Sequence, residues 1–408
     1  MEIQGRYSVA KAFTDVIEPS AVEQIRELCN QPFTQGCRIR IMPDVHSGTG
    51  CVIGFTADLG ELVIPNIVGV DIGCGMLTVE LGRIEISGER LDSVIRRYVP
   101  FGMDVHAADD EPAGAQTMRQ LLQELLCRNR LNKMERIEAS MGTLGGGNHF
   151  IEVDIDDEGN KYLVIHTGSR NLGKQVADYY QKLACGPAAG RRLSREEIQQ
   201  VVDEYRRAGR PQEIQAVLKA MIAARTCQVP DNLRYLTGEL REAYLHDMHL
   251  CQVFAEMNRR AIAAVITEQA FGRALSSLPT FETVHNYVDF ETNIIRKGAV
   301  SARKGERLLI PINMRDGSLI CTGKGNPDWN CSAPHGAGRL YSRSAARKMF
   351  SVENFQHEMQ GIYTTSVSAG TIDECPMAYK PMEAILQNIE PTVDVVKVIK
   401  PIYNFKAS

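Results

Sequence analysis

The 408-residue sequence lacks the features that mark several classes of protein. No run reaches the roughly 18 uninterrupted apolar residues that a membrane-spanning helix needs. The opening residues, MEIQGRYSVAKAF, do not show the basic and then apolar pattern of a secretory signal, so we expect a cytoplasmic protein with no membrane association. Internal repeats and low-complexity tracts are absent, and 44% hydrophobic with 24% charged residues is the composition of a packed globular protein.

Cysteine pairs of the CxxC type are also absent, although 11 cysteines are scattered between Cys29 and Cys375. This absence argues against a four-thiolate zinc site, and an odd number of scattered cysteines gives no sign of a disulfide framework. We expect most of them to be buried, reduced thiols.

The chain has no overall excess of positive charge, because its formal net charge is −4. This value argues against general nucleic-acid binding. Residues 296–348 are an exception, with 11 Lys and Arg against 3 Asp and Glu. If this segment forms one face of the protein, it can hold a polyanion; if it does not, it is an ordinary solvated surface.

The pattern of the sequence predicts one intertwined α+β domain over residues 1–408, with mixed and antiparallel sheets. Residues 37–79 alternate β-rich runs with glycine-bearing turns, as neighbouring strands do. Helical spacing then dominates at about 190–270, and it begins at a capping box formed by Ser194 and Glu197. Because β-rich texture resumes afterwards, we interpret the helices as an insertion into a sheet.

Four of the 9 histidines lie in glycine-rich, polar strings: GGGNH ending at His149, HTGSR beginning at His166, HNY beginning at His285, and HGAGR beginning at His335. Glycine lets backbone amides approach a ligand closely, and successive amides form anion-binding concavities. Each histidine taken singly is equally well explained as a structural residue in a turn. The four together favour a site that meets phosphate.

The string VDIGCGM places Asp71 and Cys74 three residues apart, between glycines that allow both side chains to turn toward one ion. A lone cysteine is often a small buried apolar residue, so this signal is weak by itself. Together with the histidines it predicts a mixed ligand set of oxygen, sulfur and nitrogen. Such a set suits manganese or zinc, and a thiolate can bridge two ions.

These strings resemble the RtcB family of RNA-splicing ligases. The similarity extends from about residue 40 to the end, through MPDVHSGTG, VGVDIGCGM, GTLGGGNHFIE, HTGSRNLG, HNYV, RKGAVSAR, HGAGR and PMAYK. The resemblance implies a single RtcB-like domain that consumes GTP and uses two Mn²⁺ per chain. It also implies the activity: joining an RNA 3′-phosphate or 2′,3′-cyclic phosphate end to a 5′-hydroxyl end, in RNA repair or tRNA splicing. Protein partners are not indicated.

The resemblance also assigns roles to residues. His335 is expected to be the nucleophile that becomes guanylylated. The expected metal ligands are Asp71 and His149 on one ion, His166 and His285 on the other, and Cys74 on both. The expected GTP contacts are Asn148, His149, Phe150, Ile151, Glu152, His285, Asn286, Pro311, Ile312, Asn313, Met314, Ser318, His335, Gly336, Ala337, Gly338 and Lys406.

The sequence departs from the family pattern at Ile312 and Asn313, where the family usually has Gly-Ser. We expect the extra bulk of Ile312 to alter nucleotide fit, which is typical of a divergent branch. Asp44 in the MPDVH string is expected to orient the substrate or another side chain.

Arg339, Arg343 and Arg347 recur every four residues after the HGAGR string. If this stretch is helical, they share one face and can guide RNA phosphates; a solvated helix face is the alternative. Two other functions stay open: a metal-dependent phosphodiesterase or nucleotidyl hydrolase that does not ligate, and a catalytically idle RNA-binding protein. His335 and the complete ligand set weigh against the idle protein.

Overall fold

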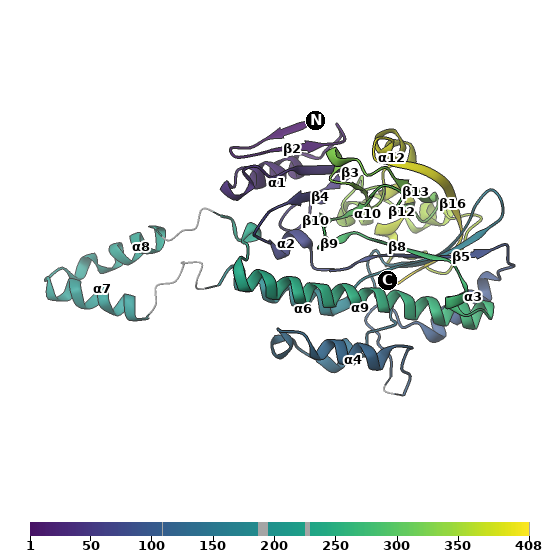
Figure 1. Cartoon of the computed structure of the whole chain (residues 1–408), viewed down its shortest axis with the longest axis horizontal. Helices are drawn as coiled ribbons and strands as arrows, with labels where there is room; N and C mark the ends of the chain where they lie inside the picture. The colour runs from purple at the N-terminus through teal and green to yellow at the C-terminus, as the bar shows by residue number, and fades with distance from the viewer. Residues whose placement is uncertain (108, 187–194, 225–228, 408) are drawn as a thin grey trace.

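Two large β-sheets and one long helix organise the protein (Figure 1). The structure is a computed structural model and describes residues 1–107, 109–186, 195–224 and 229–407. In the first sheet only β2 and β3 are parallel. Its six strands, in spatial order, are β1 (Glu2–Gln4), β2 (Val9–Ala12), β3 (Ile39–His46), β4 (Ile53–Asp58), β10 (Ile294–Lys297) and β9 (Asn286–Val288).

The second sheet has eight strands and carries most of the candidate site. Its main path is antiparallel throughout, in the order β12 (Arg307–Asn313), β13 (Gly317–Gly323), β16 (Val393–Lys406), β6 (Phe150–Ile155), β7 (Lys161–Thr167), β5 (Gly75–Gly82) and β8 (Thr280–Val284). β15 (Tyr363–Thr364) pairs in parallel with β16, and β11 (Ala299–Ser301) pairs separately with β14 (Ser332–Pro334). The predicted fold class, α+β with mixed and antiparallel sheets, is confirmed.

Helix α9 (Gly238–Phe271) runs along the eight-stranded sheet (Figure 1). Its Ile262 and Ile266 pack in one buried cluster with strand residues such as Val79 and Leu163. Fully burying an aliphatic side chain of this size contributes about 1.5–3 kcal/mol, so α9 is part of the core. The helix ends at Gly272, whose backbone is left-handed with φ +64°.

Shorter helices surround the sheets: α1 (Pro19–Cys29), α2 (Pro65–Val68), α3 (Gly88–Tyr98), α4 (Ala115–Gln123), α5 (Met134–Glu138), α6 (Arg170–Ala184), α10 (Arg343–Met349), α11 (Val352–Glu358) and α12 (Met382–Ile389). No helix in the described ranges is both long and apolar enough to cross a membrane.

The segment expected to be helical contains α7 (Arg195–Arg207), α8 (Ile214–Ala224) and α9. Ser194, the expected cap, lies outside the described residues, and the helix begins at Arg195. α7 and α8 contact each other and lie to one side of the rest of the chain in Figure 1, whereas α9 packs on β5 and β7. The two parts of the segment therefore differ in their role in the core.

The cysteines of the described residues are all free thiols. Most of them are buried, among them Cys51 and Cys321, which are fully buried. This finding confirms the expectation of reduced packing thiols. Cys74 is also buried, but its neighbours are polar.

Candidate functional site

The pairing of four strands brings the predicted metal ligands to one edge of the eight-stranded sheet. The beginning of β5 lies opposite the end of β7, because Gly75 pairs with Thr167 in an antiparallel register. The beginning of β6 meets the same place, where Phe150 pairs with His166, and the end of β8 meets β5 at Gly75. Asp71, Cys74, His149, His166 and His285 all lie at or beside these strand ends.

These five side chains form two groups that can hold metal ions, and Cys74 belongs to both. In the first group, His149 Nε2 lies 2.9 Å from Asp71 Oδ2 and 3.5 Å from Cys74 Sγ. In the second, His166 Nε2 lies 3.3 Å from Cys74 Sγ and 3.1 Å from His285 Nε2. Within each group the ligand atoms all lie within 4.8 Å of one another.

His149 and His166 each present an unprotonated ring nitrogen to these groups. His149 Nδ1 donates to the Leu144 carbonyl at 3.0 Å, and His166 Nδ1 donates to the Asn148 carbonyl at 3.2 Å, so each Nε2 lone pair faces the cluster. Burial lowers the pKa of both His166 and His285 well below the ordinary histidine value. Neutral imidazole is the form that binds a metal.

Two observations test whether a metal fits this site. Asp71 Oδ1 is buried and has no hydrogen-bond partner among the described residues, so a cation would supply the interaction that it lacks. Burial and the neighbouring Asp71 charge raise the pKa of the Cys74 thiol well above its usual range. A bound divalent ion reverses this effect and holds the thiolate. The residues therefore fit a metal.

Helix α9 holds the loops that carry the ligands. Asn258 Nδ2 donates to the Gly168 carbonyl at 3.2 Å, beside the His166 strand. Arg259 Nη1 donates to the carbonyls of Gly73 at 2.9 Å and Thr167 at 3.0 Å, which are the neighbours of Cys74 and His166. Both helix side chains are buried. The sequence analysis did not identify them.

His335 lies next to the metal groups and is held by a buried carboxylate. Its Nδ1–H donates to Asp44 Oδ2 at 2.6 Å, and its backbone N–H donates to the same oxygen at 3.1 Å. The His335 ring centroid is 4.8 Å from that of His285. Because Nδ1 is occupied, Nε2 carries the lone pair and is the free nucleophilic atom. Asp44 therefore orients another side chain, which is one of the two roles that the sequence predicts for it.

Only glycine fits at position 338 of the HGAGR string, because the backbone there lies against Asp44. Its φ is +74°, and an added Cβ would lie 2.5 Å from the Asp44 carbonyl oxygen. An alanine here would push the loop away from Asp44, which orients His335. This glycine therefore has a packing reason as well as a conformational one.

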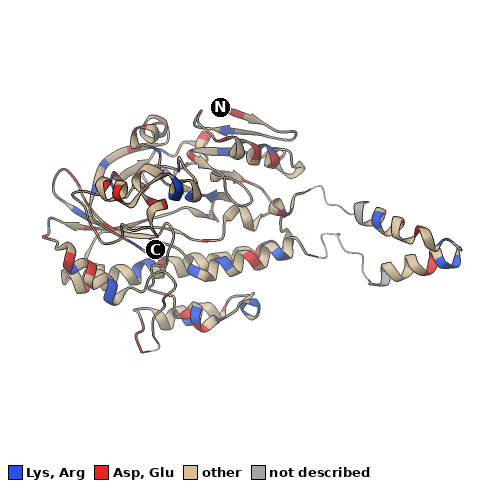
Figure 2. Cartoon of the chain, turned by 180° about the vertical axis from the view of Figure 1, so that it is seen from behind, with Lys and Arg blue, Asp and Glu red and all other residues tan. Residues whose placement is uncertain are grey.

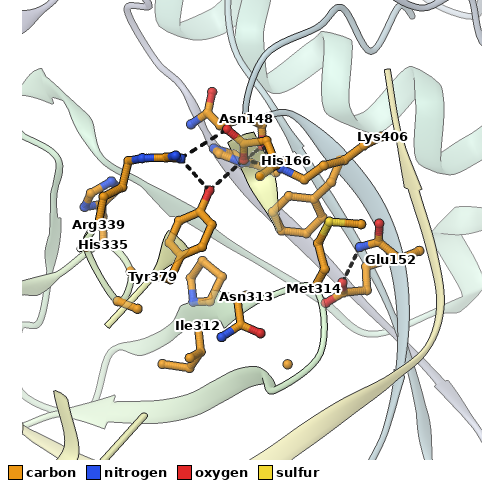
Figure 3. Close-up of a pocket in the computed structure, with 18 of the residues that line it drawn as sticks. Asn148, Glu152, His166, Ile312, Asn313, Met314, His335, Arg339, Tyr379 and Lys406 are labelled. Atoms are coloured by element: carbon orange, nitrogen blue, oxygen red, sulfur yellow. Dashed lines mark hydrogen bonds and ion pairs between the residues drawn. The ribbon is translucent and has the colours of Figure 1, made fainter. Parts of the chain in front are cut away.

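A cleft with about 820 Å³ of empty space opens beside His335 (Figure 3). His335 and Glu152 lie on opposite sides of the cleft in Figure 3. Most of the expected GTP contacts line it: Asn148, Phe150, Glu152, Pro311, Ile312, Asn313, Met314, His335, Gly336, Ala337, Gly338 and Lys406.

The other expected GTP contacts do not line the cleft. His149 and His285 belong to the metal groups, and Asn286 Nδ2 donates to the Asp71 carbonyl beside them at 3.2 Å. Ile151 packs in the core, because side chains alternate along β6 and its neighbours at 150 and 152 face the cleft. Ser318 is fully buried in β13.

Ile312 and Asn313 are both accommodated by the fold. The Ile312 side chain is only 2% exposed and packs in a core cluster, so most of its bulk points away from the cleft. Asn313 Oδ1 accepts from the backbone N–H groups of Arg315 and Asp316, which closes the turn between β12 and β13. Both residues also line the cleft, so their effect on nucleotide fit stays a prediction.

Lys and Arg positions are interspersed with Asp and Glu positions over the ribbon in Figure 2. Several cations of the basic segment 296–348 are buried or paired with acidic residues. Arg296 is buried and pairs with Asp289 at 2.9 Å, while Lys297 is buried against backbone carbonyls. Arg307 pairs with Glu80, and Arg315 pairs with Asp316. Many of these charges are therefore neutralised within the fold.

Arg339, Arg343 and Arg347 gather around two buried acidic residues. Helix α10 begins at Arg343, so Arg339 precedes it. Arg343 pairs with Asp373 at 2.7 Å and with Glu374, Arg347 pairs with Asp373 at 3.1 Å, and Arg339 pairs with Glu374 at 3.4 Å. The sequence analysis did not identify either acid.

Lys406 also pairs with Glu374, at 2.6 Å, and so links this cluster to the cleft. Burial would raise the pKa of Glu374, but Lys406 and Arg343 outweigh it and lower the pKa to about 2. Glu374 is therefore ionised at neutral pH and holds both cations in place. Because three arginines and one lysine face two carboxylates, the cluster keeps a positive excess.

Comparison with known proteins identifies the family of the chain. The sequence matches the family tRNA-splicing ligase RtcB over residues 24–407. The RNA-splicing ligase RtcB of Escherichia coli strain K12 is 29% identical over 425 residues, covering 95% of this chain and 94% of the relative. The tRNA-splicing ligase RtcB of Aeropyrum pernix is 26% identical over 436 residues, covering 85% and 83%. Since the match spans every site residue from Asp44 to Lys406, the chain belongs to the RtcB family.

Proposed function

We propose that this protein is a GTP- and manganese-dependent RNA ligase. It joins an RNA 3′-phosphate or 2′,3′-cyclic phosphate end to a 5′-hydroxyl end through a histidine–GMP intermediate, in RNA repair or tRNA splicing. The observation that carries the proposal is His335, held by Asp44 beside two ligand groups that share Cys74. A simple binding protein has no need of an oriented nucleophile next to such a centre.

The chemistry follows from the free Nε2 of His335. This nitrogen attacks the α-phosphorus of GTP, and pyrophosphate leaves. A 2′,3′-cyclic phosphate end is first opened by water, which cleaves the bond to O2′ and leaves a 3′-phosphate. An oxygen of the RNA 3′-phosphate then attacks the phosphorus of the histidine-bound GMP, which frees the imidazole and activates the RNA end. The 5′-hydroxyl attacks the activated 3′-phosphate and releases GMP, which leaves a 3′,5′-phosphodiester. Bound divalent ions would neutralise phosphate charge during these steps.

In this proposal the five ligand side chains hold two metal ions. Asp71 and His149 would hold one Mn²⁺, His166 and His285 the other, and Cys74 both. Carboxylate and imidazole ligands suit manganese, and the thiolate also admits zinc. Metal content after purification from medium containing both metals distinguishes the two.

The test uses RNA with defined ends together with GTP labelled at the α-phosphate and Mn²⁺. A ligase joins both a 3′-phosphate and a 2′,3′-cyclic phosphate donor to a 5′-hydroxyl acceptor, and its protein label is lost in acid but survives base. A phosphodiesterase or nucleotidyl hydrolase turns over without retaining label. A catalytically idle RNA-binding protein binds RNA and does neither.

Asp44→Asn is expected to slow GMP attachment by about 10²- to 10⁴-fold, because an amide does not fix the tautomer that leaves Nε2 free. Single-turnover labelling with GTP measures this rate. His46→Gln is the matched variant, because His46 lines the cleft and its Nδ1 donates to the Asp44 backbone carbonyl rather than to the Asp44 carboxylate. A wild-type rate in Asp44→Asn would mean that the carboxylate does not act through His335.

Arg347→Glu is expected to weaken RNA joining, because fewer RNA phosphates are neutralised. The slope of the logarithm of RNA affinity against the logarithm of salt concentration should fall by about one. GMP attachment should persist, since the Arg347 side chain is 58% exposed and does not line the cleft. Arg343→Glu should impair both steps, because Arg343 lines the cleft and pairs with Glu374.

Arg26→Glu on α1 is the matched control for charge reversal, as this arginine is partly exposed and its ion pair is with Glu23. RNA joining at several salt concentrations and single-turnover GTP labelling are the two measurements. An equal loss of both steps in Arg347→Glu would show that the arginines hold the active site together. It would contradict the proposal that they bind RNA phosphates.

A further inference from the structure

A second buried carboxyl lies directly behind the cleft residue Glu152. Glu152 and Asp154 are two residues apart on β6, so their side chains point to the same face of the sheet. Glu152 lines the cleft and is 3% exposed, whereas Asp154 is fully buried. Two adjacent buried carboxyls cannot both be ionised without a large cost, so one of them keeps a proton.

The neighbours of the pair decide which carboxyl keeps the proton. Glu152 pairs in register with Asn404 on β16, and Asn404 Nδ2 donates to Glu152 Oε2. Lys406 on the same strand adds a nearby positive charge, although its Nζ is paired with Glu374. On β7 the residue opposite Glu152 is Val164, which carries no charge. Glu152 is therefore surrounded by groups that favour its ionised form.

Asp154 has no such support. Neither Oδ1 nor Oδ2 accepts a hydrogen bond from the described residues. Its cross-strand neighbours are Pro401, which has no N–H, and Tyr162, whose hydroxyl donates to Asp156. Burial and the charge of Glu152 raise the pKa of Asp154 well above the ordinary aspartate value. The proton belongs on Asp154.

We propose that Asp154 is a neutral carboxylic acid that donates a hydrogen bond to the Glu152 carboxylate, and that it thereby keeps Glu152, one of the expected GTP contacts, ionised where it meets the base. This inference rests on the proposed function. An ionised Glu152 accepts from the N1–H and exocyclic N–H of guanine. Adenine presents an unprotonated N1 at that position, so its lone pair would face the carboxylate. Asp154 is thus a specificity-determining residue that acts through Glu152.

The pair also gives the selectivity a pH dependence. Burial raises the pKa of Glu152 to about 7, while the donors Asp154 and Asn404 and the charge of Lys406 oppose this rise. Below that pH Glu152 gains a proton and no longer accepts from guanine. Removing the Asp154 donor would raise the pKa further, and the GTP preference would then fail at a higher pH.

The experiment compares single-turnover labelling by α-labelled GTP and α-labelled ATP between pH 5.5 and 8.5, with Mn²⁺ present. The ratio of the two labels is the readout, because loss of metal at low pH affects both nucleotides alike. We expect the wild-type preference for GTP to fall with a midpoint near pH 7. In Asp154→Leu the midpoint should rise by about one pH unit, which lowers the preference at pH 7 roughly fivefold.

Asp154→Asn is the decisive companion variant, because its amide can donate to Glu152 but cannot ionise. If Asp154 is a neutral donor, this variant keeps the wild-type midpoint and ratio. If Asp154 were ionised, removing its charge would lower the midpoint instead, and the proposal would be overturned. Asp154→Asn decides the question even if Asp154→Leu does not fold, which thermal melting reports.

Two further outcomes separate the inference from the proposed function. A wild-type ratio at every pH in folded Asp154→Leu would overturn the role of Asp154 while leaving the ligase proposal intact. If the wild-type protein takes no label from either nucleotide, the proposed function fails. Calorimetric titration of GTP and ATP into the same three proteins then tests the selectivity of the cleft directly.

Discussion

His335→Ala is expected to abolish attachment of GMP, with a loss of about 10³-fold or more in the labelling rate. The reason is that the variant removes the only free ring nitrogen that Asp44 holds toward the cleft. RNA joining should disappear with it, because the 3′-phosphate then has no activated GMP to attack. Acid-labile incorporation of label from GTP is the measurement.

A second variant separates loss of the nucleophile from loss of structure. His335→Ala leaves the buried Asp44 carboxylate with only a backbone donor, which costs about 1–3 kcal/mol of stability. His335→Asn keeps a side-chain donor for Asp44 without a nucleophilic ring, so it should melt closer to the wild type and still take no label. His357→Ala, at an exposed position of α11, should label normally. Persistent labelling of His335→Asn would move the nucleophile to another residue.

The ligand residues could be read from the sequence because each lies in a short string whose meaning does not depend on distant contacts. Asp71 and Cys74 precede β5 by a few residues, and His149 directly precedes β6. Strand pairing then brings these strings together, and the sequence does not state that pairing. The kind of chemistry was therefore predictable from residue type. The division into two groups that share Cys74 was implied by the resemblance to the RtcB family and not by the strings themselves, and the fold brings two such groups together.

The supporting residues could not be predicted, because their importance depends on burial. Asn258 and Arg259 look like ordinary polar residues of a helix, and only their position against the Gly73 and Gly168 loops gives them a role. The role of Arg343 likewise depends on a distant contact. Its spacing predicts a cationic face, but its partner Asp373 lies 30 residues later in the chain. Long-range pairing of this kind leaves no periodic signal.

Ile312 shows a different limit of the sequence, which does not give the direction of a side chain in an irregular strand. A side chain larger than glycine at a cleft position predicts a clash with the nucleotide. In the fold the Ile312 side chain packs among core residues such as Val300 and Leu319. The direction of a side chain along an irregular part of β12, which has a register shift between Pro311 and Asn313, was not readable from the sequence.

Cys74→Ser is expected to remove metal more completely than any single histidine substitution. Cys74 Sγ lies within 3.5 Å of His149 Nε2 and within 3.3 Å of His166 Nε2, so its thiolate can contact ions in both groups. A serine hydroxyl stays protonated at neutral pH and is a poor replacement. His149→Ala or His285→Ala removes a ligand from one group only, so each should retain more metal.

Elemental analysis of the purified variants measures this difference, and thermal melting with and without added Mn²⁺ gives a readout that does not depend on catalysis. A bound ion stabilises the folded state by mass action, so the wild type should melt higher with Mn²⁺ and Cys74→Ser should respond little. Cys321→Ser is the matched control, as this thiol is equally buried but packs in an apolar cluster. Manganese content equal to the wild type in Cys74→Ser would contradict a bridging thiolate, because the four other ligands would then suffice to hold both ions.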